Sequence, residues 1–167
     1  MAAGSIRHRR GRRTDLFAIL GVLAASELPT PVPDRATLRR FRRLIADLGN
    51  DLYVALLEER LVGFLHVSYA RQLAAAARAR VEALVVAPEA RGRGVGSSLA
   101  ELARRRAERR GCHDLSYSTT SSTPRAAPFL TRQGWRSDGE VFRLDCRDGG
   151  KCVQPSQPER LAKFFRQ

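Results

Sequence analysis

The stretch VEALVVAPEARGRGVGSSLAELARRRAERRG, residues 81–111, carries the pattern that decides the fold. The apolar run 81–87 predicts a strand, Pro88 predicts a turn, and the segment after the glycines has the apolar spacing of an amphipathic helix. An arginine- and glycine-rich loop, residues 91–96, joins them. Glycine lets the backbone approach a ligand closely, and a helix N-terminus offers unpaired N–H groups at the positive end of its dipole. The stretch therefore predicts a phosphate-binding loop.

Length and cysteine usage restrict the class of protein. The chain has 167 residues, enough for one packed domain without disulfide or metal staples. No apolar run reaches the roughly 18 residues that a membrane span needs, and no apolar signal-peptide core follows the arginine-rich N-terminus. The three cysteines show no CxxC spacing and are odd in number. These features predict a cytoplasmic protein with reduced thiols and no membrane partner.

The charge of the chain is strongly positive, with a formal net charge of +13. Nearly all of this charge comes from arginine, because Lys151 and Lys163 are the only lysines. The arginine bias has two explanations: a GC-rich coding sequence, or selection for an anionic partner. In either case the electrostatic field favours anionic ligands and opposes polycationic ones.

The remaining sequence predicts a domain over residues 1–147 and a polar appendage over residues 148–167 with the pattern of a short helix at its end. Thr14 or Asp15 can cap a first helix, and Asp34 can cap a second one. Further strands are expected near 5–9, 52–57, 61–69, 113–119 and 141–146, and a short helix near 124–133. The residues Glu58-Glu59-Arg60 predict a hairpin with a three-residue loop.

Two common phosphate motifs do not fit the loop. No Gly-Lys-Ser/Thr follows it, which excludes a Walker A motif. The dinucleotide fingerprint G-x-G-x-x-G fails at its third glycine, where the chain has Ser97. The loop also follows several antiparallel-looking strands instead of the first strand of the chain, so a dinucleotide fold is not indicated.

A different signature matches the loop. The pattern Arg91-x-x-Gly94-x-Gly96 resembles the Arg/Gln-x-x-Gly-x-Gly/Ala signature of the GNAT N-acetyltransferases. The apolar strand that leads into Pro88 resembles the central strand of that family and its exit. The first motif therefore places the phosphate loop in a known family context.

A second signature supports the resemblance. Ala126, Phe129 and the pair Gly134-Trp135 resemble the alanine, aromatic and Gly-aromatic of the family's late helix, in the expected order. Two motifs in order are more specific than either alone, and the resemblance covers roughly residues 5–146. It implies an α/β fold with a mixed, mostly antiparallel sheet flanked by helices on both faces.

The resemblance implies acetyl-CoA as co-substrate and no metal. Loop amides and the helix N-terminus after them would hold the pyrophosphate, and the pantetheine arm would lie along the apolar strand. A backbone N–H of that strand could polarise the thioester carbonyl. The predicted cofactor-binding residues are Leu84, Val85, Val86, Arg91, Gly92, Arg93, Gly94, Val95, Gly96, Ser97 and Phe129.

The catalytic candidates are Glu82 and Tyr117. Glu82 is an acid within an apolar run, and buried carboxylates are rare unless they are paired or functional. The resemblance gives Glu82 the role of general base, directly or through water; the alternative is that it pairs with one of the many arginines. The family's usual tyrosine, which protonates the leaving thiolate, is replaced by Leu130, and Tyr117 or Ser118 could substitute for it.

These features predict an N-acetyltransferase that moves an acetyl group from acetyl-CoA to a primary amine. The acceptor is a small molecule, preferably neutral or anionic, or a protein; a polycationic aminoglycoside is disfavoured by the positive charge. Leu130 favours one alternative, a sensor that binds acetyl-CoA with weak turnover. The arginine content favours another, a nucleic-acid-binding protein, although nucleic acid is not the expected partner. We expect a monomer or a homodimer.

Overall fold

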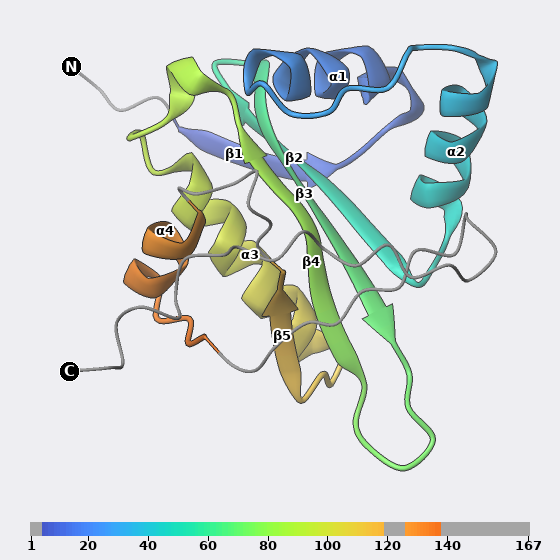
Figure 1. Ribbon diagram of the computed structural model, residues 1–167, viewed down its shortest axis with the longest axis vertical. Coiled ribbons are helices and arrows are strands. Elements are labelled where there is room, and N and C mark those ends of the chain that lie inside the picture. Colours follow the sequence, from blue (N-terminus) through green and yellow to red (C-terminus); the bar gives the residue numbers. More distant parts are fainter. Residues whose placement is uncertain (1–4, 119–125, 138–167) are drawn as a thin grey trace, which may run out of the picture. The chain divides into compact units, whose positions relative to one another are not determined.

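The computed structural model describes residues 5–118 and 126–137 (Figure 1). Residues up to Arg136 belong to one compact unit. The described elements, in chain order, are β1 (Ile6–Arg10), a 3-10 turn (Arg13–Asp15), α1 (Leu16–Ala25), α2 (Arg35–Ala46), β2 (Asn50–Leu57), β3 (Arg60–Ala70), β4 (Arg78–Val86), a second 3-10 turn (Pro88–Ala90), α3 (Val95–Arg109), β5 (Asp114–Tyr117) and α4 (Ala126–Arg132). The predicted domain boundary near 147, the strand at 141–146 and the C-terminal helix lie outside the described residues.

The described strands form one sheet in the order β1-β2-β3-β4-β5. The pairs β1–β2, β2–β3 and β3–β4 are antiparallel, whereas β4 and β5 run parallel. Helices α1 and α2 pack on one face of the sheet, where Phe41 and Val54 are buried in one cluster. Helix α3 packs on the other face, where Leu99 and Leu65 are fully buried. The predicted mixed, mostly antiparallel sheet with helices on both faces is confirmed.

The loop of the β2–β3 hairpin is shorter than predicted. Arg60 already belongs to β3, so that only Glu58 and Glu59 connect the strands. Both residues have positive φ, 50° and 64°, as a two-residue turn of this twist requires at both central positions. Because such turns usually contain glycine or asparagine, the residues Glu58-Glu59 do not predict a two-residue turn.

Of the helix caps predicted for α1 and α2, the structure contains the one at α2. Asp34 accepts a hydrogen bond from the backbone N–H of Thr37 at 2.7 Å, so it caps α2 as predicted. Asp15 directly precedes α1, but its carboxylate makes no side-chain cap there. It instead forms a bidentate pair with Arg9 of β1, at 2.6 and 2.8 Å. Asp15 therefore ties the first strand to the entrance of α1.

A buried carboxylate joins β2 to α3 on the second face of the sheet. Asp51 has no exposed surface, and its oxygens accept hydrogen bonds from Arg106 (3.0 Å), Arg110 (3.1 Å), Tyr69 (2.9 Å) and Arg10. Burial alone would raise the pKa of Asp51, but the bonds from Tyr69 and Arg106 and the two nearby positive charges lower it overall. The carboxylate is therefore ionised and is the electrostatic anchor of α3.

In the described part of the chain, none of the helices is long and apolar enough to cross a membrane.

Candidate functional site

Strands β4 and β5 diverge halfway along β4. Their parallel pairing ends at the pair Val81 and Tyr117. Strand β4 continues to Val86 and stays paired with β3 on its other side, up to the pair Gly63 and Val86. Among the described residues, the edge of β4 from Glu82 onward thus has no strand partner on the β5 side. An unpaired edge of this kind leaves backbone N–H and C=O groups free to bind an extended ligand.

A β-bulge lies at the point of divergence. In the β3–β4 register His66 is opposite Ala83 and Val67 is opposite Val81, so Glu82 is the extra residue. A bulge of this kind bends the strand and redirects its side chains. As a result Val81 and Leu84 both belong to the face covered by α3, although their spacing in a regular strand would put them on opposite faces.

The glycine-rich loop adopts a conformation that requires glycine at two positions. Gly92 and Gly94 have φ values of 73° and 82°, and Gly94 is the residue that immediately precedes α3. The first intrahelical bond runs from the N–H of Ser98 to the carbonyl of Gly94 at 3.0 Å. The N–H groups of the first turn of α3 have no intrahelical partner and point outward with the positive end of the helix dipole. The loop is therefore built to hold an anion.

Helix α4 packs closely against this loop. A Cβ atom on Gly96 would lie 3.4 Å from the ring of Phe129, so the ring packs over the first turn of α3 at about van der Waals distance from this position. The side-chain amide of Gln133 donates to the hydroxyl oxygen of Ser97 at 3.1 Å. The aromatic and the glycine of the two sequence motifs are thus in contact.

A cleft of about 900 Å³ joins the loop, the free edge of β4 and α4. This volume lies within the range of about 300 to 1,000 Å³ that is usual for small-molecule sites. Every residue predicted to bind the cofactor lines the cleft except Arg93 and Val95. The Arg93 side chain instead lies 4.0 Å from Glu58 on the hairpin, and Val95 is buried in the core. Neither side chain therefore lines the cleft in this structure.

The cleft also contains residues that the sequence did not indicate. Ser26 and Leu28, just after α1, line it, and the hydroxyl of Ser26 donates to the carbonyl of Val86 at 3.4 Å. Gln133, which follows α4, also lines the cleft. No motif marks the end of α1; only its termination before the proline-rich segment could have suggested that it faces the loop.

Tyr117 lies where β4 and β5 diverge and lines the cleft. Burial raises the pKa of its phenol above the ordinary value. The hydroxyl is therefore protonated at neutral pH and could donate a proton into the cleft.

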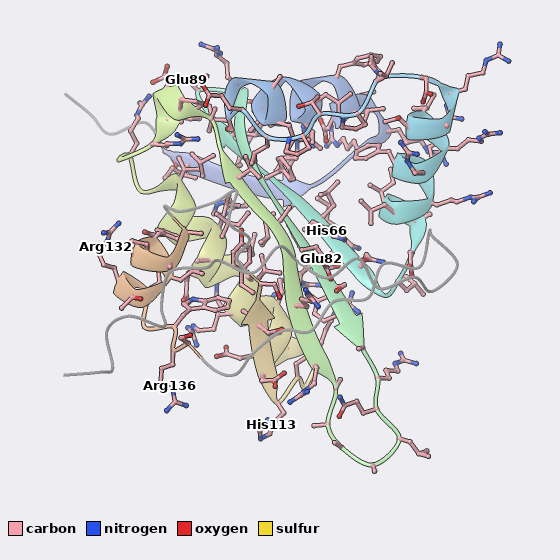
Figure 2. All side chains as sticks on the ribbon, in the orientation of Figure 1. His66, Glu82, Glu89, His113, Arg132 and Arg136 are labelled. Atoms are coloured by element: carbon pink, nitrogen blue, oxygen red, sulfur yellow. The ribbon has the colours of Figure 1, made fainter. Side chains whose placement is uncertain are left out.

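Glu82 is placed differently from the prediction. Its side chain is 38% exposed, so the expectation of a buried carboxylate is wrong. Glu82 is the extra residue of the bulge, which takes its side chain out of the cluster that packs against α3. The hydroxyl of Ser68 donates to it at 2.6 Å, and Nε of Arg80 lies 3.8 Å from it. Figure 2 shows His66 and Glu82 near one another in the middle of the sheet. Glu82 does not line the cleft itself but directly follows Val81, which does.

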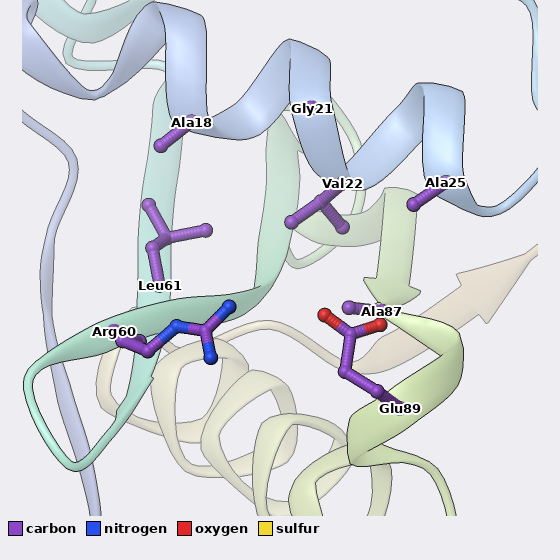
Figure 3. A pocket seen from close by; sticks show the side chains of 8 residues that line it. All are labelled: Ala18, Gly21, Val22, Ala25, Arg60, Leu61, Ala87 and Glu89. Carbon is purple, nitrogen blue, oxygen red and sulfur yellow. The ribbon is translucent and has the colours of Figure 1, made fainter.

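A second, smaller depression of about 280 Å³ lies between α1 and the start of β3 (Figure 3). The small residues Ala18, Gly21 and Ala25 form its α1 wall, and the side chains of Arg60 and Glu89 reach into it. Its described lining includes no residue of the glycine-rich loop or of the first turn of α3, and its β3 residues, Arg60 and Leu61, are paired with β2. The larger cleft is therefore the better candidate for a functional site.

The comparisons with known proteins agree with this geometry. The family model described as the acetyltransferase (GNAT) family matches residues 20–135. The chain belongs to the GNAT acetyltransferase family. A search of curated proteins found no match.

Three of the solved structures with the same fold are aligned with this chain over nearly their whole length. A transcriptional regulator from Bacillus halodurans C-125 is 28% identical, with a TM-score of 0.76, and the match covers 84% of this chain and 99% of that one. A glucosamine-6-phosphate N-acetyltransferase from Arabidopsis thaliana is 14% identical, with a TM-score of 0.72 and coverage of 85% and 99%. An aminoglycoside N-acetyltransferase solved with CoA is 19% identical, with a TM-score of 0.73 and coverage of 86% and 96%. At these low identities the last two show the fold alone.

As a GNAT family member, the protein carries both family signatures on the walls of one cleft. Arg91, Gly94 and Gly96 of the first signature and Phe129 of the second all line it. Leu130, which stands where the family resemblance implies a tyrosine, also lines the cleft. Within the described residues, no group of three or more His, Cys, Asp or Glu side chains is placed to hold a metal ion.

Proposed function

We propose that this protein transfers the acetyl group of acetyl-CoA to a primary amine of a small molecule, neutral or anionic, or of a protein. One observation carries the proposal: a single cleft connects the unpaired N–H groups at the start of α3 to the free edge of β4. The first feature suits a pyrophosphate, and the second suits an extended amide-containing arm. Acetyl-CoA combines both chemistries with a reactive thioester.

The chain's own residues have distinct roles in this proposal. The amides of the loop and of the first turn of α3 bind the pyrophosphate, and the free edge of β4 near Leu84 and Val86 orients the pantetheine arm. A backbone N–H on that edge stabilises negative charge on the thioester oxygen. Glu82, directly or through a water molecule, accepts the proton of the attacking amine, and Tyr117, protonated at neutral pH, donates one to the departing sulfur.

The test is release of thiol from acetyl-CoA in the presence of a panel of amines. Release well above the hydrolysis background with at least one amine is expected. Leu130 motivates the competing hypothesis, a sensor that binds acetyl-CoA with little turnover. Tight acetyl-CoA binding without thiol release from any amine would favour the sensor, and absence of acetyl-CoA binding would refute both.

We expect Gly94→Ala to weaken acetyl-CoA binding about tenfold, because a side chain at a φ of 82° costs about 1 to 3 kcal/mol and shifts the loop amides. The matched control is Gly111→Ala. Gly111 also has a positive φ, 66°, but lies at the far end of α3 and does not line the cleft. Calorimetric titration with acetyl-CoA should show the loss for Gly94→Ala alone. Equal affinities of the two variants would contradict the assignment of the loop.

A further inference from the structure

A polar row crosses the sheet beside the point where β4 and β5 diverge. In the strand registers Asn50, Ser68, Arg80 and Ser116 are opposite one another on four neighbouring strands. Side chains opposite one another project from the same face of a sheet. Alternation along β2 puts Asn50 on the same face as Leu52, which is covered by α1 and α2. The row is therefore a polar patch on an otherwise apolar face, opposite the side packed by α3.

The patch lies beside the point where the cleft meets the separating strands. Val81 and Tyr117 line the cleft where the two strands separate. Arg80 belongs to the polar row on the opposite face, and Glu82 lies beside that row because its carboxylate accepts a hydrogen bond from Ser68. Nη2 of Arg80 donates to the hydroxyl of Ser118 at 2.8 Å, which bridges β4 and β5 at that point. The polar patch therefore lies next to the point where the cleft reaches the separating strands.

Arg80 and Glu82 carry opposite charges within this patch without satisfying each other. Nε of Arg80 lies 3.8 Å from Oε2 of Glu82, which is too long for a hydrogen bond. The Arg80 and Glu82 side chains are 48% and 38% exposed, so both remain open to a ligand. His66 lies beside them; burial lowers its pKa, even against the opposing charge of Glu82, and its ring is neutral at pH 7. It therefore does not repel an ammonium group.

We propose that the acceptor is a small zwitterion whose amine is bound by Glu82 and whose anionic group is bound by Arg80. This inference rests on the proposed acetyltransferase function and specifies its substrate class. With hydrogen bonds of about 3 Å to each side chain, the short gap between the two charges fits an amine and a carboxylate one or two carbons apart. Free amino acids have this arrangement. In the transfer, the ammonium first loses one proton to water, and the neutral amine nitrogen then forms a bond to the acetyl carbon. The carbon–sulfur bond breaks, the second proton goes to Glu82, and the thiolate leaves and takes its proton from Tyr117.

The experiment compares L-amino acids with their amides in the thiol-release assay, with acetyl-CoA as donor. The wild type should prefer the free acid of the best pair by about 10- to 100-fold in kcat/KM, as expected for a charge-assisted hydrogen bond. Arg80→Gln should raise KM for the acid by the same factor and leave the amide unchanged. The matched control is Arg78→Gln, on the same strand, whose partner is Asp114 at 3.0 Å.

The outcomes separate this inference from the proposed function. Thiol release that is equal for acids and amides, or that Arg80→Gln lowers equally for both, overturns the zwitterion assignment and leaves the acetyltransferase intact. If no amine supports thiol release, calorimetric titration of the protein–CoA complex with the same acids and amides shows whether Arg80 and Glu82 bind a zwitterion. Tighter binding of the acids, lost in Arg80→Gln but not in Arg78→Gln, then supports the binding site alone; equal binding refutes it.

Discussion

Replacement of Asp51 by alanine is expected to lower the free energy of unfolding by about 3 to 5 kcal/mol. The carboxylate has no exposed surface and is the common partner of Arg10, Arg106, Arg110 and Tyr69. Its removal leaves the partly buried Arg106 and Arg110 without their acid, which is the costly way to break such a cluster. It also releases α3 from β2, and α3 begins at the phosphate loop.

Denaturant unfolding followed by circular dichroism measures this loss, with Glu101→Gln as control. Glu101 forms a bidentate pair with Arg104, at 2.6 and 2.8 Å, but on the exposed side of α3. Exposed pairs contribute little, so this variant should unfold at nearly the wild-type denaturant concentration. If both variants unfold alike, Asp51 does not anchor α3 and the predicted stability difference is wrong.

The same cluster predicts how stability depends on pH. The pKa of Asp51 is lower in the folded protein than in the unfolded chain, because its partners outweigh the effect of burial. A lowered folded-state pKa contributes stability that is fully present above the unfolded value and is lost as pH falls through the folded value. The wild type should therefore lose stability below about pH 4, and Asp51→Ala should lose less over the same range.

The elements that the sequence could predict are those whose signal is local. The loop and α3 were predictable because glycines at two left-handed positions, Gly92 and Gly94, precede an amphipathic helix. Asp34 was predictable as a cap because a cap depends on residues within one turn. The family signatures then connected the loop to Phe129, which local patterns alone could not have placed beside it.

The features that the sequence could not predict depend on residues far apart in the chain. Asp51 is an acid at the start of a strand, and its partners Arg106 and Arg110 come more than 50 residues later. The bulge at Glu82 exists only in the register against β3, so the apolar run around it predicted a buried acid. The hairpin turn at Glu58 has a backbone conformation that its residue type disfavours, and cross-strand pairing imposes it.

Glu82→Gln is expected to lower kcat/KM for thiol release by about 100-fold or more, because it removes the proposed proton acceptor. Glutamine keeps the size of the side chain and can still accept the hydrogen bond from Ser68. Folding and acetyl-CoA affinity should therefore be unchanged, since Glu82 does not line the cleft. The control is Glu89→Gln, an exposed acid at the smaller depression, which should retain wild-type kinetics (Figure 2).

The pH profile distinguishes a base from a residue that only positions the acceptor. If Glu82 accepts the proton, Glu82→Gln should lower kcat and change the shape of the pH profile of kcat/KM beyond the limb that the acceptor amine itself contributes, and Glu82→Asp should restore part of the rate. If Glu82 serves only to bind the ammonium, the variant should raise KM while kcat and the shape of the profile stay the same. If kcat/KM of Glu82→Gln equals that of the wild type at every pH, both roles are excluded. Glu82 is then only a structural partner of Ser68 and Arg80 at the bulge.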